Sequence, residues 1–286
     1  MPASKYIVLG TGLRYHYLEW DKAASKKTLV LVHGFLDNAW SWEPVVKEGL
    51  ASDYHVIAPD MRGHGDSDRI GKGGYYHFPD YIADLALFVK ELGRDTLYLV
   101  GHSMGGTIGS YFAGSFPDQV DKLVMLDGLG PPEMSQSIAD RIALWPNSWA
   151  QGRKREPRKY SSIDEAAARL KAYDPKLSDD LARSTATKGT RKAQDGSFVF
   201  KHDPLHLTRG PYPFQVATAH KFWSRITCPV LLVDAAESKL KYTTDEHSRR
   251  ISAFSNPTRK TISAAGHMMH RHQPIEVAKT ILKFLA

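Results

Sequence analysis

The sequence predicts an α/β fold in which a mostly parallel central sheet is flanked by helices. Apolar runs of strand length recur in the first half of the chain, and their continuity is typical of strands buried on both faces. These runs are residues 28–32, 54–58, 96–100 and 122–126. Residues 79–92 carry apolar side chains at helical spacing, and strands separated by helices pair in parallel through right-handed crossovers.

The order of the elements predicts one core that is interrupted by an insertion. The alternation of strands and helices stops at Gly128 and resumes with the apolar run 229–233. The segment between these points is polar, basic and rich in helix-forming residues. We therefore predict an α/β core made of residues 1–128 and 227–286, with a mostly helical cap of residues 129–226 inserted into it.

Composition and cysteine usage predict a soluble cytoplasmic protein without a membrane span. The chain has one cysteine, Cys228, so it can form no internal disulfide. It shows no signal-peptide pattern and no window near 18 consecutive apolar residues. Residues 141–221 hold 16 basic and 8 acidic residues, which accounts for the net charge of +7. We interpret this charge as a solvated surface rather than a nucleic-acid site, because no recognition motif accompanies it; no oligomeric state is indicated.

Ser103 is the candidate nucleophile. The run Gly101-His102-Ser103-Met104-Gly105 matches G-x-S-x-G, directly after an apolar strand and directly before the helical stretch 106–116. A nucleophile elbow needs a strand-to-helix turn so tight that only small residues fit around the serine. The turn also places Ser103 at a helix N-terminus, where the helix dipole favours developing negative charge.

Four motifs in a fixed order resemble the α/β-hydrolase superfamily. They are His33-Gly34-Phe35, the D-x-R-G-x-G-x-S stretch of residues 60–67, the elbow at residues 101–106, and Gly266-His267. Residues 189–203 and 229–233 are also similar to the serine hydrolase-like proteins, one branch of that superfamily. The resemblance implies the α/β-hydrolase fold, with the insertion at the position of the family's lid, or cap, domain.

The resemblance also implies roles for residues outside the elbow. It assigns the oxyanion hole to the backbone N–H groups of Phe35 and Met104. It places the general base in the loop before the last helix, which is His267 in this sequence. His270 and His272 lie nearby, but their spacing fits neither one helix face nor a zinc pattern, so we predict no metal site and no cofactor.

The acid of the triad is where the sequence departs from the common pattern. Most family members carry it in the loop after the strand that corresponds to residues 229–233, and Ser238 stands at that place. A minority variant takes the acid from the end of the strand after the nucleophile helix, which is Asp127 here. We therefore predict Asp127 as the acid, with Glu237 as the alternative and Asp234 or no acid as further possibilities; its role would be to orient His267.

A serine at the elbow predicts an acyl-enzyme mechanism. We expect a hydrolase, most simply a carboxylesterase that acts on a small-molecule ester. Cleavage of a carbon–carbon bond and perhydrolysis use the same residues and stay open as alternatives. A different class of function, a non-hydrolytic small-molecule receptor on the same fold, also stays open. Dehalogenase and epoxide hydrolase chemistry is disfavoured, because family members run it with aspartate at the elbow.

Overall fold

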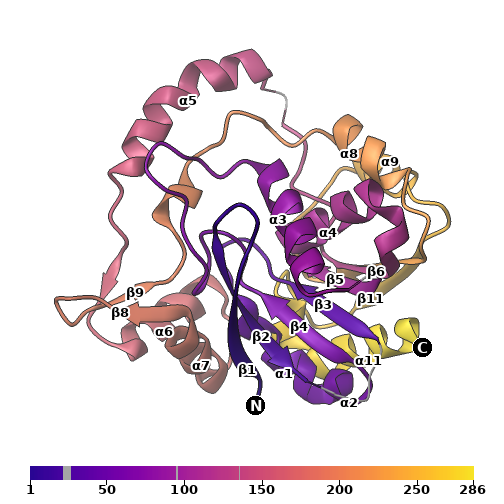
Figure 1. The fold of residues 1–286 in the computed structure, drawn as a ribbon, viewed down its shortest axis with the longest axis horizontal. Coiled ribbons are helices and arrows are strands. Elements are labelled where there is room, and N and C mark those ends of the chain that lie inside the picture. The colour runs from indigo at the N-terminus through magenta and orange to yellow at the C-terminus, as the bar shows by residue number, and fades with distance from the viewer. Residues whose placement is uncertain (22–26, 95, 135) are drawn as a thin grey trace.

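An eight-stranded sheet forms the centre of the computed structural model, which describes residues 1–21, 27–94, 96–134 and 136–286 (Figure 1). In spatial order its strands are β1 (Ala3–Val8), β2 (Arg14–Trp20), β4 (His55–Pro59), β3 (Thr28–Val32), β5 (Leu97–His102), β6 (Val120–Leu126), β10 (Val230–Ala235) and β11 (Thr258–Ile262). The pairs β1–β2 and β2–β4 are antiparallel, and every pair from β4 to β11 is parallel. The predicted mostly parallel sheet is confirmed.

Helices cover both faces of the sheet, which explains the continuous apolar runs of its inner strands. All five residues of β3 and all five of β4 are buried, as two-sided cover requires. The core helices are α1 (Glu43–Val45), α2 (Ala51–Asp53), α3 (Phe78–Glu91), α4 (Met104–Ser115), α9 (Thr244–Ile251), α10 (Met269–His272) and α11 (Pro274–Leu285). One apolar cluster joins the sheet to α3 and α4, and a second joins its other face to α1 and α11.

Between β6 and β10, the described residues form four α-helices, a 3-10 helix (Pro204–Leu207) and a small sheet of their own. The α-helices are α5 (Ile138–Arg153), α6 (Ile163–Tyr173), α7 (Asp179–Gly189) and α8 (Val216–Trp223). The sheet has the order β7 (Lys159–Tyr160), β9 (Phe198–Phe200), β8 (Thr190–Lys192). These strands have two or three residues each, which is too short for a periodic signal in the sequence.

Residues 129–226, called the insertion below, do not form one layer. In Figure 1 they run from pink to light orange, with α5 at the outer edge and α6 and α7 paired below it. The last helix, α8, packs on the core helix α4. Trp223 of α8 is fully buried there, and its indole N–H donates to Ser110 Oγ at 2.8 Å.

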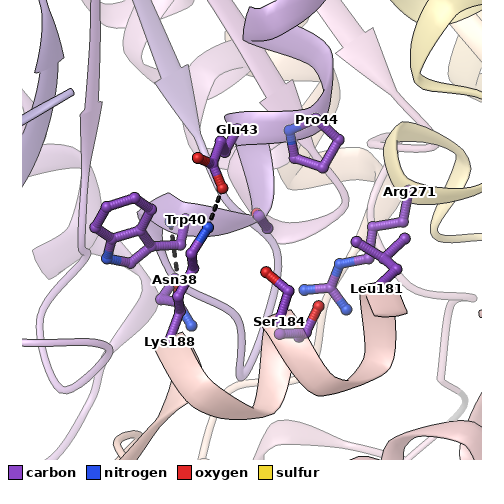
Figure 2. Close-up of a pocket in the computed structure, with 10 residues that line it drawn as sticks. Asn38, Trp40, Glu43, Pro44, Leu181, Ser184, Lys188 and Arg271 are labelled. Atoms are coloured by element: carbon purple, nitrogen blue, oxygen red, sulfur yellow. Dashed lines mark hydrogen bonds and ion pairs between the residues drawn. The ribbon is translucent and has the colours of Figure 1, made fainter. Parts of the chain in front are cut away.

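A narrow seam joins α7 of the insertion to the core (Figure 2). Lys188 of α7 forms an ion pair with the carboxylate of Glu43, and Lys47 Nζ lies 3.0 Å from the same carboxylate. The Nζ of Lys188 also lies 4.6 Å from the centre of the Trp40 ring. The cavity in this seam measures about 20 Å³, room for about one water molecule. The cavity is therefore too small for a substrate, and the contacts of this seam hold the insertion against the core.

A helix that crosses a bilayer needs about 20 consecutive, mostly apolar residues. Within the chain segments that the structure describes, no helix combines the length and the apolar character needed to cross a bilayer.

Candidate active site

Ser103 lies at the turn between β5 and α4, in a backbone conformation that side chains disfavour. Its φ is 52° and its ψ is −118°, and strain of this kind clusters at functional sites. The turn closes only because two neighbours are glycines. A Cβ at Gly101 would lie 2.2 Å from the Gly105 carbonyl oxygen, and a Cβ at Gly105 would lie 2.1 Å from the carbonyl oxygen of Val32. The G-x-S-x-G pattern is thus a steric requirement of the turn that presents Ser103.

Several backbone N–H groups near this turn donate to no other group in the described part of the chain, and two of them match the predicted oxyanion hole. They belong to Phe35, in the loop after β3, and to Met104, the first residue of α4. Gly34 lets the loop approach the elbow closely, since a Cβ there would lie 2.8 Å from His102 Nδ1. Free donors beside a helix N-terminus suit an oxygen atom on which negative charge develops.

His267 lies between β11 and α10 and connects Ser103 with Asp127. Its Nε2 is 2.9 Å from Ser103 Oγ, and its Nδ1 is 2.7 Å from Asp127 Oδ2. Because an ionised carboxylate only accepts hydrogen bonds, Nδ1 carries the proton and Nε2 keeps a lone pair that faces the serine hydroxyl. The His267 side chain is 33% exposed, so the imidazole is partly accessible to solvent.

Asp127 follows directly on β6 and is held on both sides. Its backbone N–H donates to the Val233 carbonyl oxygen at 2.8 Å, and its φ of 47° turns the chain out of the sheet. Its side chain is only 7% exposed. Besides the bond to His267, Asp127 Oδ2 accepts a second hydrogen bond from Ser238 Oγ at 2.5 Å.

The other two carboxylates considered from the sequence have different partners. Glu237 Oε2 forms an ion pair with Lys176 Nζ at 2.7 Å, and the Glu237 side chain is 50% exposed. Asp234 in β10 faces Arg259 at 3.6 Å, and burial raises the pKa of its carboxyl above the ordinary value. Of these three carboxylates, the structure brings Asp127 to His267.

Two residues of the site were not predicted as part of it, Ser238 and His102. Ser238 is 4% exposed and bonds to the Asp127 carboxylate. His102 Nε2 donates to the backbone oxygen of His267 at 2.7 Å. Burial lowers the pKa of His102 well below its ordinary value, and His270 and His267 beside it add to that shift, so the ring is a neutral donor. The sequence shows His102 in the elbow motif and Ser238 at the usual place of the acid, but it does not show where their side chains point.

A further chain of contacts supports the loop of His267 from the insertion. The Gly266 N–H donates to His272 Nδ1 at 3.0 Å, and His272 Nε2 donates to Asp174 Oδ2 at 2.8 Å. Asp174 directly follows α6. Burial opposes ionisation of this carboxyl, but the hydrogen bond from His272 holds the pKa of Asp174 below its ordinary value. The residue before the candidate base is therefore fastened to the insertion.

The remaining histidine of this segment, His270, is fully buried against Trp42 and His102. Burial lowers its pKa to about 4, so it is neutral at neutral pH. Elsewhere among the described residues, the side chains of His16, Asp60 and Asp66 bring together atoms of the metal-ligand type. Asp60 Oδ2 already accepts from His16 Nδ1 and from the Asp66 N–H. We interpret this group as a brace of the turn at residues 60–67.

Comparison with known proteins assigns the fold to a family. A family model described as alpha/beta hydrolase fold matches residues 27–271. The chain belongs to the α/β-hydrolase family. Among its relatives, the "Serine hydrolase-like protein" of Danio rerio is 29% identical over 93% of this chain and 83% of its own length. The resemblance noted in the sequence is confirmed, and this α/β-hydrolase family member is a hydrolase.

Other α/β-hydrolase relatives differ in what they share with this chain. The thioesterase domain from the curacin biosynthetic pathway has a TM-score of 0.86 at 23% identity, with 99% of both chains covered, which shows the fold alone. The soluble epoxide hydrolase of Corynebacterium is 37% identical, but over 48% of this chain and 46% of its own length. The names of these similar proteins thus cover more than one hydrolytic chemistry. The reaction of this chain has to be inferred from its own residues at the elbow.

Proposed function

We propose that this α/β-hydrolase is a serine carboxylesterase with Ser103 as nucleophile, His267 as general base and Asp127 as acid. The observation that carries the proposal is the unbroken chain of hydrogen bonds from Asp127 through His267 to Ser103, with distances of 2.7 and 2.9 Å. Both lie within the range for a working nucleophile and base. We further propose that the insertion serves as the cap over this site.

The chemistry follows from the tautomer that Asp127 imposes. His267 Nε2 takes the proton of Ser103 as Oγ attacks the carbonyl carbon of the ester. The oxygen of the tetrahedral intermediate becomes negative, and the N–H groups of Phe35 and Met104 would donate to it. His267 then passes its proton to the leaving alcohol, and the acid part of the ester remains on Ser103. Water, activated by the same imidazole, releases it.

Serine at the elbow favours this reaction over epoxide opening, despite the partial likeness to epoxide hydrolases. Family members that open epoxides use an aspartate at this position, which forms an ester that water then cleaves at the aspartate itself. Ser103 would instead form an ether with an epoxide carbon, and the enzyme could not hydrolyse an ether. An ester, thioester or amide carbonyl gives an acyl-serine that water can cleave.

Active-site labelling tests the proposal most directly. A fluorophosphonate probe should form one adduct, located on Ser103 by mass spectrometry, and Ser103→Ala should remove both this adduct and the turnover of p-nitrophenyl esters. A series of esters with increasing acyl length then gives the preferred substrate. Labelling that persists in Ser103→Ala would contradict the assignment. Tight binding of small esters without labelling or turnover would favour the receptor alternative.

A further inference from the structure

Ser238 is a buried serine whose hydroxyl has its direction fixed. The residue follows β10, and its side chain is 4% exposed. Its Oγ accepts a hydrogen bond from the Leu240 N–H at 3.1 Å, and its own N–H donates to the Ala235 carbonyl oxygen at 3.1 Å. Since one lone pair of Oγ is taken by Leu240, the hydroxyl proton is directed to the remaining neighbour, Asp127 Oδ2, at 2.5 Å.

The oxygen that Ser238 contacts is the same one that His267 uses. Asp127 Oδ2 accepts from Ser238 Oγ at 2.5 Å and from His267 Nδ1 at 2.7 Å. The terminal torsion of an aspartate is broad and nearly two-fold, so a single partner leaves the carboxylate plane poorly defined. Two donors on one oxygen fix that plane. A hydroxyl bonded to a buried carboxylate also offsets the cost of keeping it ionised.

The position of Ser238 in the chain is the one where an acid is expected. It stands in the loop where most family members carry the acid itself, while the acid of this chain comes from the end of β6. The two positions therefore meet at one point beside the imidazole: one supplies the carboxylate and the other a hydroxyl that holds it. The Oγ of Ser238 is separated from His267 Nδ1 by a single shared oxygen atom.

We propose that Ser238 is a positioning residue of the Ser103–His267–Asp127 triad, which it serves only through Asp127. The inference rests on the proposed function. Without the hydroxyl, Asp127 would remain in place on β6, but its carboxylate would spend less time aligned with Nδ1. The imidazolium that forms during proton transfer would then be stabilised less. The loss should appear in kcat rather than in KM, because Ser238 does not contact the substrate.

A double-mutant cycle tests this, with turnover of a p-nitrophenyl ester by the full chain as readout. Ser238→Ala should lower kcat about tenfold, the kinetic equivalent of a weak hydrogen bond to a charged group, with KM unchanged. Ser238→Thr keeps the hydroxyl and should retain most of kcat. In the Asp127→Asn background, Ser238→Ala should change kcat by less than about twofold, because residues that act through one another are not additive.

Ser110→Ala is the matched control for folding. Ser110 is also a fully buried serine, and its hydroxyl donates to the Thr107 carbonyl oxygen at 2.8 Å and accepts from Trp223. If its melting temperature falls as far as that of Ser238→Ala while its kcat stays near wild type, the loss in Ser238→Ala is not a folding effect. Two outcomes would overturn the inference and leave the triad standing. One is an equal loss of kcat from Ser238→Ala in both backgrounds, and the other is an undiminished kcat in Ser238→Ala beside an inactive Asp127→Asn. Full activity of Asp127→Asn would overturn the triad, and the inference with it.

Discussion

The loops after β6 and after β10 each carry an acidic residue that the sequence offers as a partner for His267, yet the two carboxylates have different environments. Asp127 after β6 is buried and bonds to His267 and Ser238. Glu237 after β10 is half exposed and bonds to Lys176 of the insertion. The carboxylate of Asp127 faces His267, and the carboxylate of Glu237 faces the insertion. The comparison teaches that nearness in the sequence to the expected acid position is a weaker guide than the burial and the partners of the carboxylate.

The largest expected effect comes from neutralising the buried acid. Asp127→Asn keeps the volume of the side chain but cannot stabilise the imidazolium, and in a serine protease triad the same change lowers kcat about 10⁴-fold. We expect a loss of similar size here, measured as kcat on a p-nitrophenyl ester, with the variant still folded by circular dichroism. An active Asp127→Asn beside an inactive Glu237→Gln would reverse the two roles.

A second variant asks whether the β10 loop can take over the acid. In Asp127→Asn with Ser238→Asp, the new carboxylate stands at the place that most family members use. It should raise kcat about tenfold to a hundredfold above that of Asp127→Asn alone. This factor is the kinetic equivalent of a hydrogen bond to a charged group, about 1.5 to 3 kcal/mol. Ser238→Asn in the same background is the control, and equal activity of the two would show that the position no longer reaches His267.

The smallest effect is expected for the exposed carboxylate. Glu237→Gln removes a half-exposed ion pair with Lys176, and such pairs contribute about 0 to 1 kcal/mol to the free energy of unfolding. The value of kcat should change by less than about twofold, since the side chain is outside the path of the proton. Lys176→Met, measured in the same denaturant titration, removes the other partner. A loss of kcat above tenfold in either variant would show that this contact does more than fasten the insertion.

Much of the core could be predicted because its signals are local and repeated. The apolar runs of β3, β4, β5 and β6 each predict a strand that is buried on both faces, and apolar residues at helical spacing predict α3. The insertion was harder. Its strands β7, β8 and β9 are too short to show a period, and α8 looks in the sequence like part of the insertion although it packs on α4. Tertiary contacts such as those of Trp223 with Ser110 and of Phe222 with Tyr111 reveal this packing, and the sequence alone does not.

The site was predictable as far as its motifs extend. Ser103 lies between two glycines, Gly101 and Gly105, that the tight turn requires. His267 stands in the loop that the family resemblance points to, and Asp127 could be chosen because it directly follows a strand. The hydrogen bond between Ser238 and Asp127 could not, because it joins loops 111 positions apart in the sequence. Likewise, the link from Asp174 through His272 to Gly266 depends on how a helix end of the insertion meets a loop of the core.

That link bears on whether residues 129–226 could be exchanged with the corresponding segment of another family member. A graft that replaces residues 129–226 would remove Asp174, and with it the acceptor of the nearly buried His272 N–H. A polar group left unpaired in this way costs about 1 to 3 kcal/mol, and the imidazole would seek another orientation. The Gly266 N–H would then lose its own acceptor, one residue from His267, the proposed general base. A replacement segment would therefore have to bring a hydrogen-bond acceptor to this spot, or it would disturb the proton transfer that we propose for His267.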